Sequence, residues 1–264
     1  MIKQKKITII GTGNLGSSII KGLISNEYAA GNIIATRRKI DYLQSFAQIG
    51  VITTSDNIEA VKEADFIIIA VKPFKIISIL EEIAPVLNPG QLIISVVSGV
   101  SIDRIKAQLN SKNIPVCRAM PNTAIAINES MTCIAAPGTT DDQKKAIGEL
   151  FSGLGKSIFV NEEMMDASTV LAACGIAFAM RFIRAMMQGG IEIGFDSKTA
   201  RFIVNQTVKG AAELLIRNEL HPEEEIDKVT TPKGYTISGL NEMEHNGFSS
   251  SLIKGILTSF NKIE

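Results

Sequence analysis

A glycine-rich turn directly after an apolar run constrains the fold of this chain more than any other feature. Residues 6–10 read Lys-Ile-Thr-Ile-Ile, and a G-x-G-x-x-G pattern follows at 11–16. In such a pattern the first glycine permits a tight strand-to-helix turn, the second lets the backbone approach a pyrophosphate, and the third lets the helix pack close to the strand. The pattern predicts a dinucleotide site at the start of a helix, and the alternative is a glycine-rich turn without a ligand. The residues assigned to it are Gly11, Thr12, Gly13, Asn14, Leu15 and Gly16.

The bulk composition narrows the classes of function. The chain has 264 residues, 45% of them hydrophobic, which suits one or two domains with an ample core. Its formal net charge of zero gives no reason to expect a nucleic-acid partner. The cysteines lack a C-x-x-C pair and read as buried free thiols of a cytoplasmic protein, and with two histidines no metal site is expected. The apolar stretch at 167–180 is shorter than a bilayer span, so we expect a buried helix and no membrane partner.

The first part of the chain alternates strand and helix signals. Helical patterns lie between the apolar runs, and Thr140 and Gln143 form a capping-box pattern before one of them. This alternation is typical of an α/β domain, so we predict a Rossmann-type doubly wound parallel sheet over residues 1–161. The predicted strands are residues 7–10, 32–36, 65–71, 91–97, 116–119, 131–135 and 157–160.

From residue 162 onward the pattern becomes helical and no strand signal remains. We therefore predict a second, all-α domain over residues 162–264. Residues 170–180 are apolar on every side, and such a helix cannot face water. We infer that a second subunit covers it, since a two-fold interface is the commonest solution. The alternative is burial against the first domain of the same chain.

The end of the second predicted strand indicates which cofactor binds. The position that reads the ribose lies about 20 residues beyond the glycine turn. This stretch offers Thr36, Arg37 and Arg38 and no carboxylate for the ribose hydroxyls of NAD. Guanidinium groups form forked, charge-assisted bonds to a 2′-phosphate, so we expect NADP(H) as the preferred cofactor, with NAD(H) possible. The alternative is an ordinary solvated helix start.

Further cofactor contacts are expected where the parallel strands end, because the ligand crevice lies at that edge of the sheet. Lys72 would sit near phosphate or nicotinamide, and a solvated loop lysine is the equal alternative. Asn122 would bind a carboxamide or order a water molecule. The residues assigned to this edge are Asn57, Ala70, Val71, Lys72, Pro73, Ser98, Gly99, Met120, Pro121 and Asn122.

Acidic and basic catalytic side chains are scarce in this sequence. The nucleotide-binding half has no histidine, and no G-x-x-G-x-x-K-x-x-x-N helix is present. Reduction of a carbonyl usually needs a proton donor near the oxygen. A protonated C=N group carries its own electrophilic charge and needs little beyond positioning. The scarcity therefore favours imine reduction.

Further motifs lie in both halves of the chain. They are Ala-Val-Lys-Pro at 70–73, Arg-Ala-Met-Pro-Asn-Thr at 118–123, Gln-Thr-Val-Lys-Gly-Ala-Ala at 206–212, His-Pro at 221–222 and Asp-Lys-Val-Thr-Thr-Pro-Lys-Gly-Tyr-Thr at 227–236. The Met-Pro-Asn-Thr stretch and the Val-Thr-Thr-Pro loop are specific in combination. Together with the glycine turn, these motifs make the whole chain resemble pyrroline-5-carboxylate reductase, the last enzyme of proline synthesis.

The resemblance implies NADPH-dependent reduction of 1-pyrroline-5-carboxylate to L-proline by hydride transfer to the C=N bond. It also implies interlocked dimers, often assembled into decamers. Thr236 matches the threonine that hydrogen-bonds the ring nitrogen in the family, and the alternative is that it only begins a helix. The substrate residues implied are Thr231, Lys233, Gly234, Tyr235, Thr236 and Asn122. Two other functions stay open: reduction of another cyclic imine or small carbonyl acid, and a non-enzymatic NADP-binding regulatory role.

The sequence departs from the family pattern near the expected substrate site. Lys233 and Tyr235 replace residues of the usual Pro-Gly-Gly-(Thr/Ala)-Thr loop. If the family glycine needs positive φ, either the lysine there is strained or the loop has shifted. Ile176 replaces a helix-kinking proline, and Phe74 replaces a glutamine. His221 reads as the end of a turn before a helix and is assigned no catalytic role.

Overall fold

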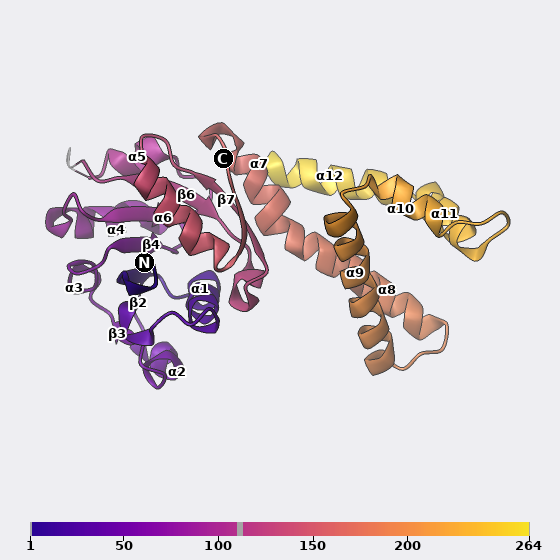
Figure 1. The fold of residues 1–264 in the computed structure, drawn as a ribbon, viewed down its shortest axis with the longest axis horizontal. Coiled ribbons are helices and arrows are strands. Elements are labelled where there is room, and N and C mark those ends of the chain that lie inside the picture. Colours follow the sequence, from indigo (N-terminus) through magenta and orange to yellow (C-terminus); the bar gives the residue numbers. More distant parts are fainter. Residues whose placement is uncertain (1, 110–112, 264) are drawn as a thin grey trace. The chain divides into compact units, whose positions relative to one another are not determined.

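The structure is a computed structural model that describes residues 2–109 and 113–263. It divides the chain into two compact units, one of Met1–Cys174 with Lys262–Glu264 and the other of Gly175–Asn261. This division falls within a helical stretch, later than the domain boundary expected at 161/162, which stays a prediction. Figure 1 shows the sheet of the first unit and the helices of the second.

An eight-stranded sheet forms the frame of the first unit. The strand order is β3-β2-β1-β4-β5-β6-β7-β8, and every described pair is parallel except β6 with β7. β1 lies between β2 and β4, so the turn that follows it opens between these two strands. The strands are β1 (Ile7–Ile10), β2 (Ile33–Thr36), β3 (Ile52–Thr54), β4 (Phe66–Ile69), β5 (Leu92–Ser95), β6 (Val116–Met120), β7 (Ser130–Ala135) and β8 (Gly155–Phe159).

The sheet differs from the expected one in two places. β7 runs antiparallel to β6, so the prediction of a fully parallel sheet was wrong there. The connection between them holds only a short 3₁₀ segment, η6 (Thr123–Ile127), whereas a parallel pair needs a crossover of a dozen or more residues. β3 was not predicted, because it has three residues and lies exposed at the sheet edge.

Helices cover both faces of the sheet, as a doubly wound fold requires (Figure 1). One apolar core joins the sheet to α1 (Asn14–Ser25), α2 (Gln44–Ala47) and α6 (Asp141–Ser152). The other joins it to α3 (Asn57–Val61), α4 (Ile76–Ile83) and α5 (Ile102–Lys106). Adjacent residues of one strand serve opposite cores, since Ile68 packs in the first and Ile67 in the second. The predicted capping box of Thr140 and Gln143 at α6 is confirmed.

A buried arginine ties the start of the long helical stretch to the sheet. Arg118 on β6 donates to Glu162 Oε1 at 3.4 Å and to Asp166 Oδ1 at 3.3 Å. Glu162 also accepts a 2.7 Å hydrogen bond from the backbone N–H of Ile102, so the same carboxylate caps α5. This stretch continues through η7 (Glu162–Met164), α7 (Met165–Ser168) and a π-helical turn, η8 (Thr169–Cys174), into the second unit.

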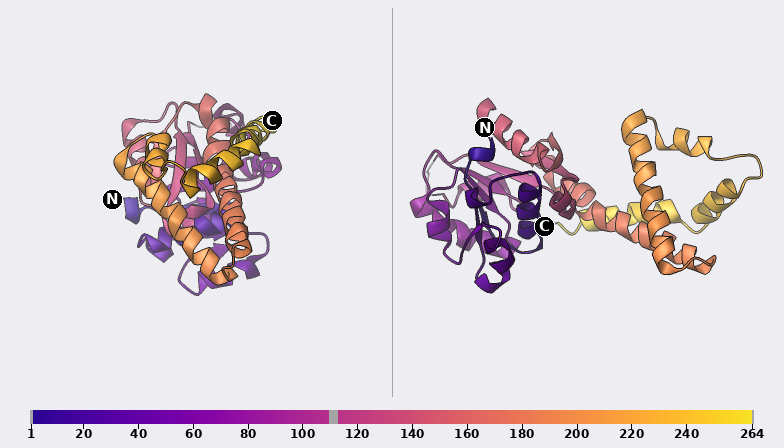
Figure 2. Two further views of the ribbon diagram at one scale, coloured as in Figure 1. Left: turned by 90° about the vertical axis from the view of Figure 1, so that its right-hand side faces the viewer. Right: turned by 60° about the horizontal axis from the view of Figure 1, so that its bottom comes forward.

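The second unit is helical throughout its described residues. Gly190 lets α8 and α9 approach closely, because a Cβ there would lie 3.2 Å from that of Ala200. Figure 2 shows these two helices crossing within the unit. The helices are α8 (Gly175–Glu192), α9 (Ser197–Asn218), α10 (Pro222–Lys228), α11 (Tyr235–His245) and α12 (Phe248–Phe260).

The apolar helix expected to be buried is largely exposed within the described chain. No residue of α8 is buried, and Leu171 and Met180 are 71% and 57% exposed. The other helices of its own unit therefore leave α8 uncovered, and burial against the first domain stays an alternative. The expectation that the apolar stretch is too short to span a membrane is wrong by length and composition alone. The stretch belongs to a continuous helix, Glu162–Glu192, that is long and apolar enough to cross a membrane, and 6% of its most apolar 18-residue segment is buried. The same two criteria are met by apolar helices that pack in protein.

Candidate cofactor-binding site

The glycine turn has the geometry that its three glycines predict. Gly11 has a φ of +90°, and a Cβ there would lie 2.5 Å from Val71 Cγ1, so only glycine fits without movement. A Cβ on Gly16 would lie 2.7 Å from the carbonyl oxygen of Gly11, which keeps α1 close to the strand. A Cβ on Gly13 would meet nothing within 4 Å, because this residue faces open space. The first and third glycines serve packing, and the second leaves room at the backbone.

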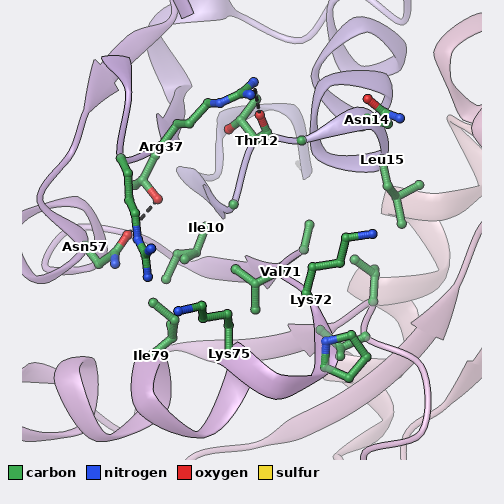
Figure 3. Close-up of a pocket in the computed structure, with 18 of the residues that line it drawn as sticks. Ile10, Thr12, Asn14, Leu15, Arg37, Asn57, Val71, Lys72, Lys75 and Ile79 are labelled. Carbon is green, nitrogen blue, oxygen red and sulfur yellow. Dashed lines mark hydrogen bonds between the residues drawn. The ribbon is translucent and has the colours of Figure 1, made fainter. Parts of the chain in front are cut away.

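Neighbouring strands hold the turn in place. The N–H groups of Gly11 and Thr12 donate to the carbonyl oxygen of Thr36 at 3.2 and 2.9 Å. The Arg37 guanidinium donates to the carbonyl oxygen of Thr12 at 3.0 Å and lies 4.2 Å from the centre of the Tyr42 ring. Figure 3 shows the Arg37 side chain reaching across to Thr12. The loop is thus pre-organised before any ligand binds.

A cavity of about 790 Å³ opens beside this turn, at the carboxyl ends of the strands. Such a volume suits a small-molecule or cofactor site. The predicted cofactor residues that line it are Gly11, Thr12, Gly13, Asn14, Leu15, Thr36, Arg37, Arg38, Asn57, Ala70, Val71, Lys72, Pro73 and Ser98. The lining residues that the sequence reasoning missed are Ile10, Lys39, Ser55, Lys75, Ile79, Val96, Val97 and Thr123.

Five cations and no carboxylate line this cavity within the described chain. Arg37 and Lys75 are half-buried on opposite walls, and the others are exposed. A cavity with this charge attracts a polyanion. The five are Arg37, Arg38, Lys39, Lys72 and Lys75.

Hydrogen bonds link Asn57, the first residue of α3, to the end of β2 and to α4. The buried Thr36 hydroxyl donates to Asn57 Oδ1 at 2.7 Å, and Asn57 Nδ2 donates to the two oxygens of Glu82 at 3.3 and 3.2 Å. The Glu82 carboxylate can only accept, which sets the orientation of the amide. The Thr36 proton expected to serve a phosphate is therefore given to Asn57.

Five predicted cofactor residues do not line the cavity. Gly16 packs beneath the turn, and Gly99 lines a second cavity of about 350 Å³ beside Ser98. Met120 is buried in a small cluster with Ala135 and Met165. Pro121 and Asn122 lie between β6 and η6, outside the lining, and their binding roles stay predictions.

Asn122 holds its surroundings together through its side-chain amide and its backbone N–H. Its Oδ1 accepts from the N–H of Ala124 at 2.9 Å, and its own N–H donates to Ser130 Oγ at 3.1 Å. Its Nδ2 donates to the carbonyl oxygen of Ala172 at 3.1 Å, within the π-helical turn. This bond links the segment between β6 and η6 to the π-helical turn.

The loop expected to bind substrate forms a tight turn in the second unit. Lys233 has a φ of +60°, and the N–H of Gly234 donates to the carbonyl oxygen of Thr231 at 2.8 Å. A proline followed by a residue of positive φ is typical of a type II turn, so the predicted strain at Lys233 is confirmed. A Cβ on Gly234 would lie 2.5 Å from Thr231 Oγ1. Gly234 precedes α11 without a side-chain cap, and Tyr235 is 99% exposed.

Other sequence expectations concern groups outside the cavity. His221 caps α10, with Nδ1 accepting from the N–H of Glu223 at 3.3 Å, which confirms its assignment to a helix start. Cys117 and Cys133 are buried as expected, whereas Cys174 is half-buried. Burial raises the pKa of the Cys117 thiol, and burial together with Asp65 raises the pKa of Tyr28. Neither group lines the cavity.

Comparison with known proteins assigns both parts of the chain. Residues 162–264 match the family model for pyrroline-5-carboxylate reductase dimerisation, and residues 6–99 match the model for NADP oxidoreductase, coenzyme F420-dependent. The first match begins at the boundary expected from the sequence.

Several similar sequences and structures are named pyrroline-5-carboxylate reductase. The chain is 43% identical to pyrroline-5-carboxylate reductase 2 of Dictyostelium discoideum, covering 98% of this chain and 92% of that protein. It is 44% identical to reductase 1 of that organism over 97% of this chain, and there it spans 49% of the relative's length. The structure of a pyrroline-5-carboxylate reductase from Coxiella burnetii is 30% identical with a TM-score of 0.87, covering 98% and 97% of the two chains. That of Plasmodium falciparum pyrroline carboxylate reductase with NADP bound shares the fold, with a TM-score of 0.91 at 24% identity over 99% and 97%. The chain therefore belongs to the pyrroline-5-carboxylate reductase family.

Proposed function

We propose that this chain catalyses the NADPH-dependent reduction of 1-pyrroline-5-carboxylate to L-proline. The observation that carries the proposal is a cavity lined by five cations and no carboxylate on a glycine turn built for close backbone approach. The family to which the chain belongs supplies the substrate. NADPH is favoured over NADH because no acidic residue among the described lining is available for a free ribose 2′-hydroxyl.

The cavity fits a dinucleotide phosphate. The open space at Gly13 admits the pyrophosphate to the start of α1, where no side chain caps the helix. Lys72 and Pro73 line the far end of the cavity with Ser98, where the nicotinamide would lie. When bound, the cofactor supplies the hydride that reduces the C=N carbon.

In this proposal the residues of the chain bind and orient the substrate and do not act as general acids or bases. In our proposal the free N–H groups at the start of α11 bind the substrate carboxylate, and Lys233 adds a positive charge beside them. The Thr236 hydroxyl hydrogen-bonds the ring nitrogen and holds the protonated imine in place. Thr231, Gly234 and Tyr235 shape this loop, and Asn122 keeps the rim of the cofactor cavity in position. A protonated imine needs little more than such positioning.

Two copies of the chain form the working unit in this proposal. Residues 1–161 bind NADP(H), and residues 162–264 provide dimerisation and substrate binding. The exposed apolar surface of α8 supports a second copy as its cover, because no residue of that helix is buried by its own chain. We propose the cytoplasm as the location, which suits free cysteines, and decamers as the larger assembly that the family resemblance implies.

One assay tests the activity. The full chain is mixed with NADPH and with 1-pyrroline-5-carboxylate, a panel of other cyclic imines, or small keto acids, and NADPH oxidation is followed by absorbance. We expect turnover to be fastest with 1-pyrroline-5-carboxylate. Faster turnover of another imine or of a keto acid would replace the substrate assignment. NADPH binding without turnover of any compound would favour a regulatory protein instead.

A further inference from the structure

Two of the three groups that the sequence assigns to the 2′-phosphate have partners within the chain. The Arg37 guanidinium binds the carbonyl oxygen of Thr12 and stacks on Tyr42. The Thr36 hydroxyl gives its proton to Asn57. Of the three, only Arg38 lines the cavity without such a bond among the described residues. A second cation near the adenosine end would therefore strengthen recognition of a doubly charged phosphate.

The opposite wall of the cavity supplies one from the start of α4. Lys75, Ile79 and Glu82 are spaced i, i+4 and i+7, which places them on one helix face. Ile79 lines the cavity, and Glu82 binds Asn57 at the end of β2. This face is thus directed at the adenosine end, and Lys75 lies on it nearest the carboxyl edge of the sheet. Figure 3 shows the Lys75 ammonium turned into the cavity toward Asn57.

The surroundings of Lys75 suit a phosphate contact. The side chain is half-buried, which reduces the screening of its charge by solvent and salt. Its Nζ lies 5.5 Å from the centre of the Phe74 ring, and no described carboxylate forms an ion pair with it. An ammonium has three donors on a flexible stem and binds phosphate as a point charge.

We infer that Lys75 is a specificity-determining residue that binds the 2′-phosphate of NADPH from the wall opposite Arg38. This inference rests on the proposed function, because it concerns the cofactor of that reaction. It adds to the arginines at the end of β2 a cation from a separate element. Selection of NADPH over NADH then depends on how β2 and α4 are held together through Asn57.

The test measures binding directly. Dissociation constants for NADPH, NADH and adenosine 2′,5′-bisphosphate are measured by titration calorimetry for the wild-type chain and for Lys75→Met. We expect about tenfold weaker binding of NADPH and of the bisphosphate, because a charge-assisted bond is lost, and a change of less than about twofold for NADH. Lys75→Arg retains most of the preference. The control is Lys145→Met, which removes the same charge from an exposed position of α6 and leaves all three dissociation constants unchanged.

Each other outcome overturns the inference in a recognisable way. Equal weakening for NADPH and NADH would place Lys75 at the pyrophosphate or make its role structural. Unchanged NADPH binding in Lys75→Met, with a loss in Arg38→Ala, would leave the 2′-phosphate to β2 alone. If the wild-type chain bound neither NADPH nor NADH, both the cofactor assigned in the proposed function and the role inferred for Lys75 would be refuted.

Discussion

Alanine at Gly13 is expected to separate cofactor binding from folding. A Cβ at this position meets nothing within 4 Å, and the backbone has an extended conformation that any residue adopts, with φ −89° and ψ −151°. The free energy of unfolding should therefore change by less than about 0.5 kcal/mol. The added methyl group stands where the pyrophosphate must approach the backbone. Loss of one charge-assisted contact costs about 1.5–3 kcal/mol, which is roughly tenfold to hundredfold in the dissociation constant for NADPH.

Alanine at Gly16 provides the matched control with the opposite result. Its Cβ would lie 2.7 Å from the backbone carbonyl oxygen of Gly11, so α1 has to move away from the strand. Overpacking of this kind costs about 1–3 kcal/mol, and the better helix propensity of alanine returns up to about 1 kcal/mol. We expect a net loss of about 1–2 kcal/mol, which lowers the melting temperature by roughly 2–8 °C in a domain of this size.

The two variants are compared by thermal unfolding without ligand and by NADPH titration. We expect Gly13→Ala to melt within about 2 °C of the wild-type protein and to bind NADPH poorly. Gly16→Ala should melt earlier. Unchanged NADPH binding in Gly13→Ala would refute the placement of the pyrophosphate. A fall in melting temperature as large as that of Gly16→Ala would show that the open space at Gly13 is needed for folding.

Three further results are expected. Thr236→Ala should lower kcat about 10²-fold and leave the dissociation constant for NADPH unchanged, and Thr236→Ser should keep most of the activity. If Thr236→Ala lowered kcat and NADPH affinity equally, Thr236 would not contact the ring nitrogen. Met180→Asp should convert dimers to monomers in light scattering, because the exposed side chain lies on the α8 surface assigned to the second copy, and an intact dimer would contradict this. Burial and Asp65 raise the pKa of Tyr28 in the folded state, so its contribution to stability should be full below the ordinary tyrosine pKa of about 10 and fall as the pH rises above it. In urea titrations Tyr28→Phe should make that fall smaller, and a fall of unchanged size would assign it to other groups, such as the buried Cys117 thiol.

The sequence predicted those parts of the fold whose signal is local. Gly11 has a positive φ, and Gly16 packs against the carbonyl oxygen of Gly11, so the conformation of the turn is set within its own short segment. The capping box of Thr140 and Gln143 likewise involves neighbours in the chain. Helices α1 and α9 have the bounds that their patterns indicate.

Long-range features were missed because periodicity does not encode them. An apolar run looks alike in a parallel and an antiparallel strand, so the direction of β7 was wrong, although the short connection after β6 held the relevant signal. Lys75 and Ile79 line the cavity because of the face that α4 presents to it, and this rotation of the helix depends on its packing against the sheet. The bond from Thr36 to Asn57 joins residues 21 positions apart, and no sequence pattern announces it.

The Arg118 junction has a consequence for how the protein is made. It fixes the first turns of the long helix to a sheet that a single chain completes, while the apolar length beyond it has no cover in that chain. We therefore expect a newly synthesised subunit to fold its nucleotide-binding half before it associates with a second subunit. Until then the subunit exposes its apolar helix to other cellular proteins. Its lifetime in dilute solution should depend on protomer concentration, so chaperone capture and aggregation compete with pairing during biogenesis.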